Sequence, residues 1–221
     1  MQEVIKFEWL GLHLQEPMGI IMNLAMAAFS FFAFFKLNKT QADEAGKWWK
    51  LFYLTFGIST VFGALGHGLF FYFGVPGKFA CWIAGCLANV FCAKAILSFT
   101  GYQIKNKALE VFIWSKSLLL LVAALITQKF VFVAVDAIVT YLTFTGGFAL
   151  MLKKRGLQEM KYMILGVIVL LPSAFVFLLK INIHRWFDKN DLSHVLMLSG
   201  ITCFFLGIYA WNTRRTKIQH V

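Results

Sequence analysis

Charged residues are scarce in this sequence, and acidic residues are the scarcest. Only 14% of the 221 residues are charged, and ten are Asp or Glu. Soluble domains usually carry about 25% charged residues, so the composition excludes an ordinary soluble enzyme. It also excludes a disordered chain, because disorder needs few apolar residues and a high net charge. Apolar residues make up 60% of the chain instead, which predicts a membrane protein with several spans.

Several sequence signatures are also missing. The chain has three prolines and no stretch rich in Pro or Ser that would mark a linker, so we expect one domain over residues 1–221. No HExxH, GxSxG, P-loop or Rossmann pattern occurs. The last apolar run has no internal lysine for a retinal Schiff base. The four cysteines lie in apolar runs without a CxxC pair, which indicates buried thiols rather than disulfides.

Seven apolar runs are long enough to cross a bilayer, which takes roughly 20 residues. They cover about residues 18–35, 48–73, 79–99, 111–126, 130–152, 162–179 and 192–211. The predicted fold is therefore an all-α bundle of seven transmembrane helices. The first fifteen residues mix apolar and charged residues and lack a cleavage site, so we expect a short segment at the membrane interface.

The net charge of +11 comes from 21 basic residues that cluster between the apolar runs. In a soluble protein this excess would suggest nucleic acid; here it is a topology signal, and no nucleic-acid partner is expected. Fifteen basic residues, Lys94 and Lys116 among them, fall on one side of the predicted membrane, and six, including Lys78, fall on the other. The basic side should be cytoplasmic, which places the N-terminus outside and the C-terminus inside.

Ionisable residues inside a span are costly, by about 2.5–3.5 kcal/mol on insertion scales, and are candidates for a functional site. The predicted spans place five of them at one depth in the outer third of the membrane: Glu16, His67, Asp136, Asp191 and His194. Helical spacing also puts Asn23 on the face of Glu16, and Thr140, Thr143 and Gly147 on the face of Asp136. A shared depth predicts a single common site.

Each of these residues also has a structural interpretation. Asn190 and Asp191 are suited to capping the seventh helix. Glu16 is suited to the start of the first helix, where the helix dipole favours an acid. The glycines around His67 are typical of close helix packing, and His67 itself can be an interior histidine. Asp136 is the hardest to explain in this way, because a carboxylate within a span needs a partner.

Two imidazoles and up to three carboxylates are the ligand types of zinc or another divalent metal. In this scheme His67, His194 and Asp191 hold the metal, and Asp136 is the catalytic base or a fourth ligand. Glu16, Asn190 and Asn23 would contact these ligands and orient them. An open position on the ion would hold an activated water.

The same residues resemble a known group of proteins. Seven spans, Glu16-Pro17 at the first, His67 in the second and His194 opening the seventh are similar to the superfamily of alkaline ceramidases, hemolysin-III-like proteins and adiponectin/progestin receptors. More closely, residues 187–195 (FDKNDLSHV) look like a small, uncharacterised bacterial seven-transmembrane family with an Asn-Asp-Leu-x-His element. The likeness covers the whole chain by topology, and two short motifs are specific.

The resemblance implies a zinc ion held by three histidines, with metal-activated water cleaving a lipid amide or related bond. His67 and His194 match two of those ligands. The third is replaced by Asn190, the superfamily's serine near His67 is Gly63, and the third helix has no Asp, which leaves Asp136 as the comparable acid.

Three alternatives therefore remain. The first is a metal-dependent hydrolase of a membrane lipid or lipid-like amide or ester, acting from the outer side of a bacterial inner (plasma) membrane. The second is a non-enzymatic sensor or small-solute or ion transporter that uses the same polar cluster. A packing partner in a larger membrane complex is a third possibility. The sequence gives no oligomeric state.

Overall fold

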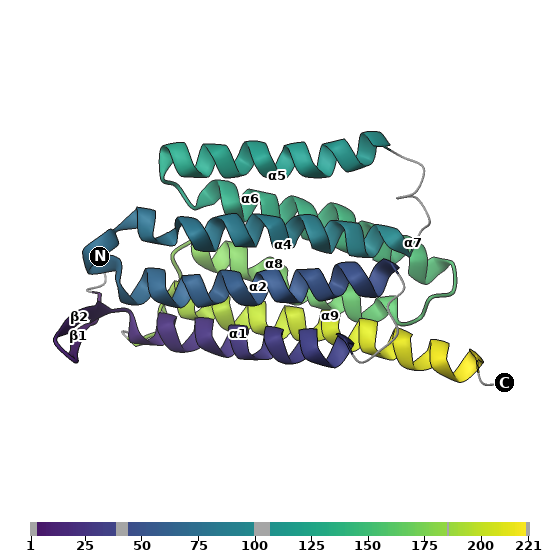
Figure 1. The fold of residues 1–221 in the computed structure, drawn as a ribbon, viewed down its shortest axis with the longest axis horizontal. Coiled ribbons are helices and arrows are strands. Elements are labelled where there is room, and N and C mark those ends of the chain that lie inside the picture. Colours follow the sequence, from purple (N-terminus) through teal and green to yellow (C-terminus); the bar gives the residue numbers. More distant parts are fainter. Residues whose placement is uncertain (1–3, 39–43, 100–106, 185, 220–221) are drawn as a thin grey trace.

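The computed structural model describes residues 4–38, 44–99, 107–184 and 186–219. Its elements, in chain order, are β1 (Lys6–Trp9), β2 (Leu12–Gln15), α1 (Pro17–Asn38), α2 (Glu44–Gly68), α3 (Phe70–Phe73), η1 (Val75–Lys78), α4 (Phe79–Ser98), α5 (Lys107–Thr127), α6 (Val131–Val139), η3 (Thr140–Phe148), α7 (Ala149–Lys154), α8 (Met160–Leu178) and α9 (Lys189–Gln219). The long helices run side by side in one bundle, with the β-hairpin at one end and the C-terminus at the other (Figure 1). We call these the hairpin end and the C-terminal end.

Seven helical segments of the described chain are long and apolar enough to cross a membrane. They are Pro17–Leu37, Glu44–Gly68, Val75–Ser98, Lys107–Thr127, Val131–Lys154, Met160–Phe177 and Lys189–Arg214. Each overlaps one of the seven expected runs, so the architecture is compatible with an integral membrane protein. The second run differs at its end, because α2 stops at Gly68 and α3 forms a separate short turn.

The N-terminal segment is an antiparallel hairpin, in which Lys6 pairs with Gln15 and Trp9 with Leu12. Leu10 and Gly11 connect the strands with φ angles of 51° and 75°, both in the left-handed region. A two-residue turn with two positive φ angles matches the twist of a hairpin. The side chains of Trp9 and Leu10 are exposed at its tip.

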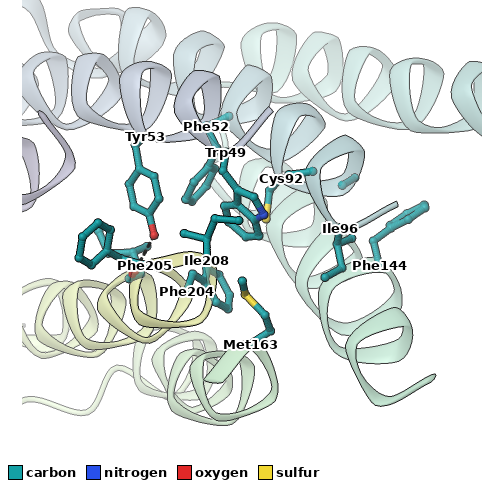
Figure 2. Close-up of a cluster of buried hydrophobic side chains, with 14 of the residues drawn as sticks. Trp49, Phe52, Tyr53, Cys92, Ile96, Phe144, Met163, Phe204, Phe205 and Ile208 are labelled. Atoms are coloured by element: carbon teal, nitrogen blue, oxygen red, sulfur yellow. Dashed lines mark hydrogen bonds between the residues drawn. The ribbon is translucent and has the colours of Figure 1, made fainter. Parts of the chain in front are cut away.

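The core lies where α2 packs against α1 and α4 and where its large side chains reach those of α9. Trp49, Phe52 and Tyr53 of α2 face Phe204 and Phe205 of α9 (Figure 2). The Tyr53 hydroxyl donates a hydrogen bond of 2.8 Å to the carbonyl of Ile201, so its polar end is satisfied inside the apolar cluster. These contacts fix α2 and α9, the helices that carry the two histidines.

The periphery of the bundle is α5, which lies along one side of it (Figure 1). Only 17% of its apolar window is buried, the lowest share of the seven spans. Leu118, Leu119 and Ile126 are exposed on its outer face. Its outer face is thus apolar and exposed, whereas its inner face carries the charged side chain of Lys116.

The fifth span changes helix type in its middle. It continues from α6 into the π-helix η3 and then into α7. The wider π turn shifts the register, so Thr145 and Gly146 are buried while Thr143 and Gly147 are exposed. The predicted face of Asp136, Thr140, Thr143 and Gly147 is therefore wrong beyond Thr140, because α-helical spacing does not hold there. Such π segments are frequent at functional sites.

Candidate functional site

A cavity of about 320 Å³ lies inside the bundle toward the hairpin end. Its volume falls within the range of small-molecule sites, roughly 300–1,000 Å³. Most of its wall is apolar, with side chains such as Met26, Phe56, Val133 and Leu170. The polar residues that line it are Asn23, Ser59, Thr60, His67, Lys78, Asn89, Tyr141, Ser173, Asn190, Ser193 and His194. The cavity thus joins a long apolar wall to a set of nitrogen-bearing side chains.

Glu16 and His67 form the central polar contact at this end. His67 Nδ1 donates a hydrogen bond to the Glu16 carboxylate. Burial raises the pKa of Glu16, but the hydrogen bond from His67 and the charges of His67, Lys78 and Lys189 outweigh it and hold that pKa below its ordinary value. Glu16 has a φ of 51°, an unfavourable angle for a residue with a side chain. Its contacts therefore hold it in place at the junction of β2 and α1.

Lys78 and His194 complete the cluster around His67. Lys78 Nζ lies 3.5 Å from His67 Nδ1 and 5.0 Å from the centroid of the Phe70 ring, where it makes a cation–π contact. The rings of His67 and His194 stand almost perpendicular, with centroids 5.8 Å apart. Four elements therefore meet here: the β2–α1 junction, α2, η1 and α9.

Two glycines of α2 make this meeting possible. A side chain at Gly63 would collide with Oδ1 of Asn23, and one at Gly66 would lie 2.9 Å from Cγ of Lys78 and 3.1 Å from the carbonyl of Gly77. Asn23 can then lie against α2 while its amide donates a 2.8 Å hydrogen bond to the carbonyl of Gly19. The close-packing interpretation of the Gly-rich stretch therefore describes its role.

His194 contains an unusual polar atom. Its Nδ1 is buried and has no hydrogen-bond partner among the residues that the structure describes. Such a group normally costs about 1–3 kcal/mol, so native proteins seldom leave one without a reason. His194 is one of the residues that line the cavity, so this nitrogen lies close to it.

Asp136 belongs to a different cluster, which we call the buried ion pair. Its side chain is fully buried and pairs with Lys116 of α5. Lys116 Nζ also donates to the Thr140 hydroxyl at 2.8 Å, Ser117 donates to Asp136 at 2.7 Å and Asn89 donates at 2.8 Å. Both carboxylate oxygens are thus bonded. Asp136 is not among the residues that line the cavity; Asn89 connects the two.

This network corrects the count of basic residues. Lys116 was assigned to the cytoplasmic side, but its side chain is 8% exposed and lies within the span of α5. The sequence analysis did not identify Lys116 as a site residue. Its position inside the apolar run 111–126 could have done so, because an ionisable residue within a span needs a partner. Lys78 was also missed, because its place beside the start of a run made it look like a loop residue.

Asp191 and Asn190 lie at the start of α9. The Asp191 carboxylate accepts a 3.0 Å hydrogen bond from the backbone N–H of Asp188. The Asp188 carboxylate accepts hydrogen bonds from the N–H groups of Asn190, at 2.7 Å, and Asp191, at 3.2 Å. This reciprocal arrangement is a capping box. The capping interpretation therefore accounts for the contacts of Asp191, while Asn190 both joins the cap and lines the cavity.

These contacts decide how the residues fit the expected metal. In the described ranges no group of three or more His, Cys, Asp or Glu side chains is arranged to hold an ion. His67 and His194 come together as expected, but Asp191 is bonded in the helix cap and Asp136 in the buried ion pair. A catalytic zinc needs three protein ligands, so the residues as arranged do not fit that ion. The single predicted site is two separate clusters and a cap.

Comparison with known proteins adds one result. No curated protein and no solved structure matches the chain. A family of unknown function (DUF6962) matches residues 18–213, which include every described span from the first turn of α1 almost to the end of α9. Because the match covers most of the sequence, the chain belongs to the DUF6962 family.

Proposed function

We propose that this protein binds a small amphipathic, lipid-like molecule inside the membrane and acts as a sensor for it. The single observation that carries the proposal is the cavity, which combines a mostly apolar wall with nitrogen-bearing side chains at one end. A molecule with an apolar tail and a polar head has the complementary shape. The unpartnered His194 Nδ1 supplies a position for the head.

The opening of the cavity supports a ligand that arrives from the lipid. Phe130, Val131, Val135 and Leu142 line the cavity and are also exposed on the outside of the bundle. Phe130 immediately precedes α6, Val131 and Val135 lie in α6, and Leu142 lies in η3. The neighbouring helix α8 packs only loosely against α6. A tail can therefore enter sideways between α6 and α8. The basic-residue count favours a membrane orientation with the hairpin end outside, in a bacterial inner membrane.

Photo-crosslinking tests this proposal directly. The full-length protein, purified in detergent, is irradiated with dodecanol carrying a diazirine in its chain, and the adducts are mapped by mass spectrometry. We expect adducts on cavity-lining residues of α6 and α8. The variant Ala174→Trp fills the cavity from α8 and should lose those adducts, whereas Leu119→Trp on the exposed face of α5 should keep them. Equal labelling of native protein and Ala174→Trp would contradict the proposal.

Hydrolysis is a second candidate, and one observation favours it. The bond between Glu16 and His67 orients an imidazole at the polar end of the cavity, as a general base requires. A lipid-like ester or amide bound there would have its polar bond near His67. Release of fatty acid from such a substrate by native protein, lost in Glu16→Gln and in His67→Gln, would favour this reaction. Measurement of zinc, manganese and iron in the same sample tests the metal-dependent form.

A further inference from the structure

The cavity wall is positively polarised at its polar end. Lys78 is the cation among the lining residues, and His67 and His194 stand beside it. The lining includes neither Asp nor Glu. Asn23 and Asn190 also line the cavity, and their amide groups can donate hydrogen bonds. A head group that accepts hydrogen bonds and carries negative charge is therefore complementary to this end.

Lys78 is placed for such a head group and is not neutralised by an ion pair. Within the described parts of the chain, no carboxylate lies within ion-pair distance of its Nζ. Glu16, whose charge acts on Lys78 from nearby, is hydrogen-bonded to His67 instead. Gly66 and the ring of Phe70 fix the stem and the ammonium group of Lys78. The cation is thus positioned before any ligand arrives.

A second, independent observation points to the same place. His194 Nδ1 is buried without a partner, and its ring lies against that of His67. A neutral imidazole with Nδ1 protonated donates one hydrogen bond from this nitrogen. An anionic oxygen placed between Lys78 and His194 would accept from both. Charge-assisted hydrogen bonds of this kind are roughly twice as strong as neutral ones.

We infer that the head group recognised by Lys78 and His194 is anionic, a carboxylate or a phosphate, on an amphiphile whose apolar chain lies between α6 and α8. This inference rests on the proposed function and names the class of ligand. The cavity is at the small end of the range for ligand sites, which suits a single short or medium chain. The carboxylate and the phosphate share the chemistry, and the experiment separates them.

Competition with the diazirine dodecanol gives the test. Four competitors share one chain length: dodecanoate, dodecyl phosphate, dodecanol and dodecylamine. We expect at least one of the two anions to displace the probe at a concentration roughly tenfold or more below that of dodecanol, with dodecylamine weakest. The better of the two anions identifies the head group.

Variants link that preference to Lys78. Lys78→Met keeps most of the stem and removes the charge, so the preference for an anion should fall to within about threefold of dodecanol. Lys129→Met is the matched control, because it removes an exposed charge from the connection between α5 and α6 without touching the cavity. Lys78→Arg keeps the charge and should keep the preference. It supplies the comparison if Lys78→Met does not fold.

The possible outcomes distinguish a failure of the head-group inference from a failure of the proposed amphiphile binding. If native protein binds dodecanol as well as both anions, the head-group inference is overturned while an amphiphile site remains. If Lys78→Met keeps the full preference, Lys78 is not the recognition residue and the inference is also overturned. If unlabelled competitors leave the labelling unchanged, the proposed function itself fails.

Discussion

The two buried polar clusters of this bundle are built differently. In the buried ion pair, Asp136 is bonded to Lys116, Ser117 and Asn89, and both of its oxygens have partners. At the hairpin end, His194 Nδ1 lacks a partner, Lys78 has no paired carboxylate among the described residues, and a cavity adjoins both. A saturated cluster stabilises a fold, whereas an incomplete one beside a cavity leaves room for a ligand. Polar residues in a span therefore differ in function according to whether their bonds are already made.

The largest effect should come from breaking the saturated cluster. Asp136→Asn leaves the Lys116 charge buried without its counter-ion, which should destabilise the protein by about 3–5 kcal/mol. The melting temperature of the purified protein should fall accordingly. The labelling of the cavity at temperatures below that transition should stay close to native, because Asp136 does not line the cavity.

A double variant sharpens this prediction. Lys116→Met combined with Asp136→Asn removes both charges and leaves an amide for Ser117 and Asn89. We expect it to recover most of the lost stability, because replacing a buried pair is often neutral. If the single variant is as stable as native protein but loses ligand labelling, then Asp136 belongs to the functional site and the distinction between the clusters fails.

The next effect concerns the start of α9, where the polar side chains have their hydrogen bonds made and cap the helix. Asp188→Ala removes the acceptor of two N–H groups and should cost about 0.5–2 kcal/mol, measured by thermal unfolding. Asp191→Asn keeps a side-chain oxygen for the N–H of Asp188, so it should cost less. A loss of bound metal in Asp191→Asn, at unchanged stability, would instead identify Asp191 as a metal ligand.

The number and positions of the spans could be predicted, because a bilayer-spanning helix must be apolar over its whole length. His67 and His194 were expected at one depth, and their rings do lie together, but depth alone does not place two helices side by side. The hairpin could not, because its turn is Leu10-Gly11 rather than the Asn-Gly or Asp-Gly pair that signals one. An amphipathic stretch of that length indicates an interface but not a strand pair.

The division of the polar residues could not be predicted either. Depth places Asp136 and Asp191 near the histidines along the membrane normal, but it gives no information on which helices are neighbours. Lys116 reaches Asp136 because α5 packs beside α6, a tertiary fact. The π-helix after Asp136 changes which threonines face inward, and α-helical spacing cannot give that change.

The third prediction concerns the cluster at the hairpin end. Here a substitution should raise the stability of the protein rather than lower it. His194→Phe keeps a ring in the cavity wall and removes the unpartnered nitrogen, so stability should rise by about 1 kcal/mol. The preference for anionic competitors should fall in the same variant. A rise in stability with loss of ligand is expected where function keeps a polar group unsatisfied. A fall in stability with unchanged ligand preference would make His194 a packing residue.

The smallest effect concerns the link between the hairpin and the cavity. The pKa of Glu16 lies below its ordinary value of 4.5 in the folded protein. The stabilisation from its bond to His67 is therefore complete above pH 4.5 and is lost as the pH falls through the lowered folded pKa. Glu16→Gln removes this contribution, so its melting temperature should lie below native by an amount worth about 1 kcal/mol or less, and the gap should close in acid. Glu8→Gln, on the exposed part of the same hairpin, should show no such gap at any pH. A gap for Glu16→Gln that persists unchanged in acid would mean that the carboxylate charge does not hold the hairpin to the bundle.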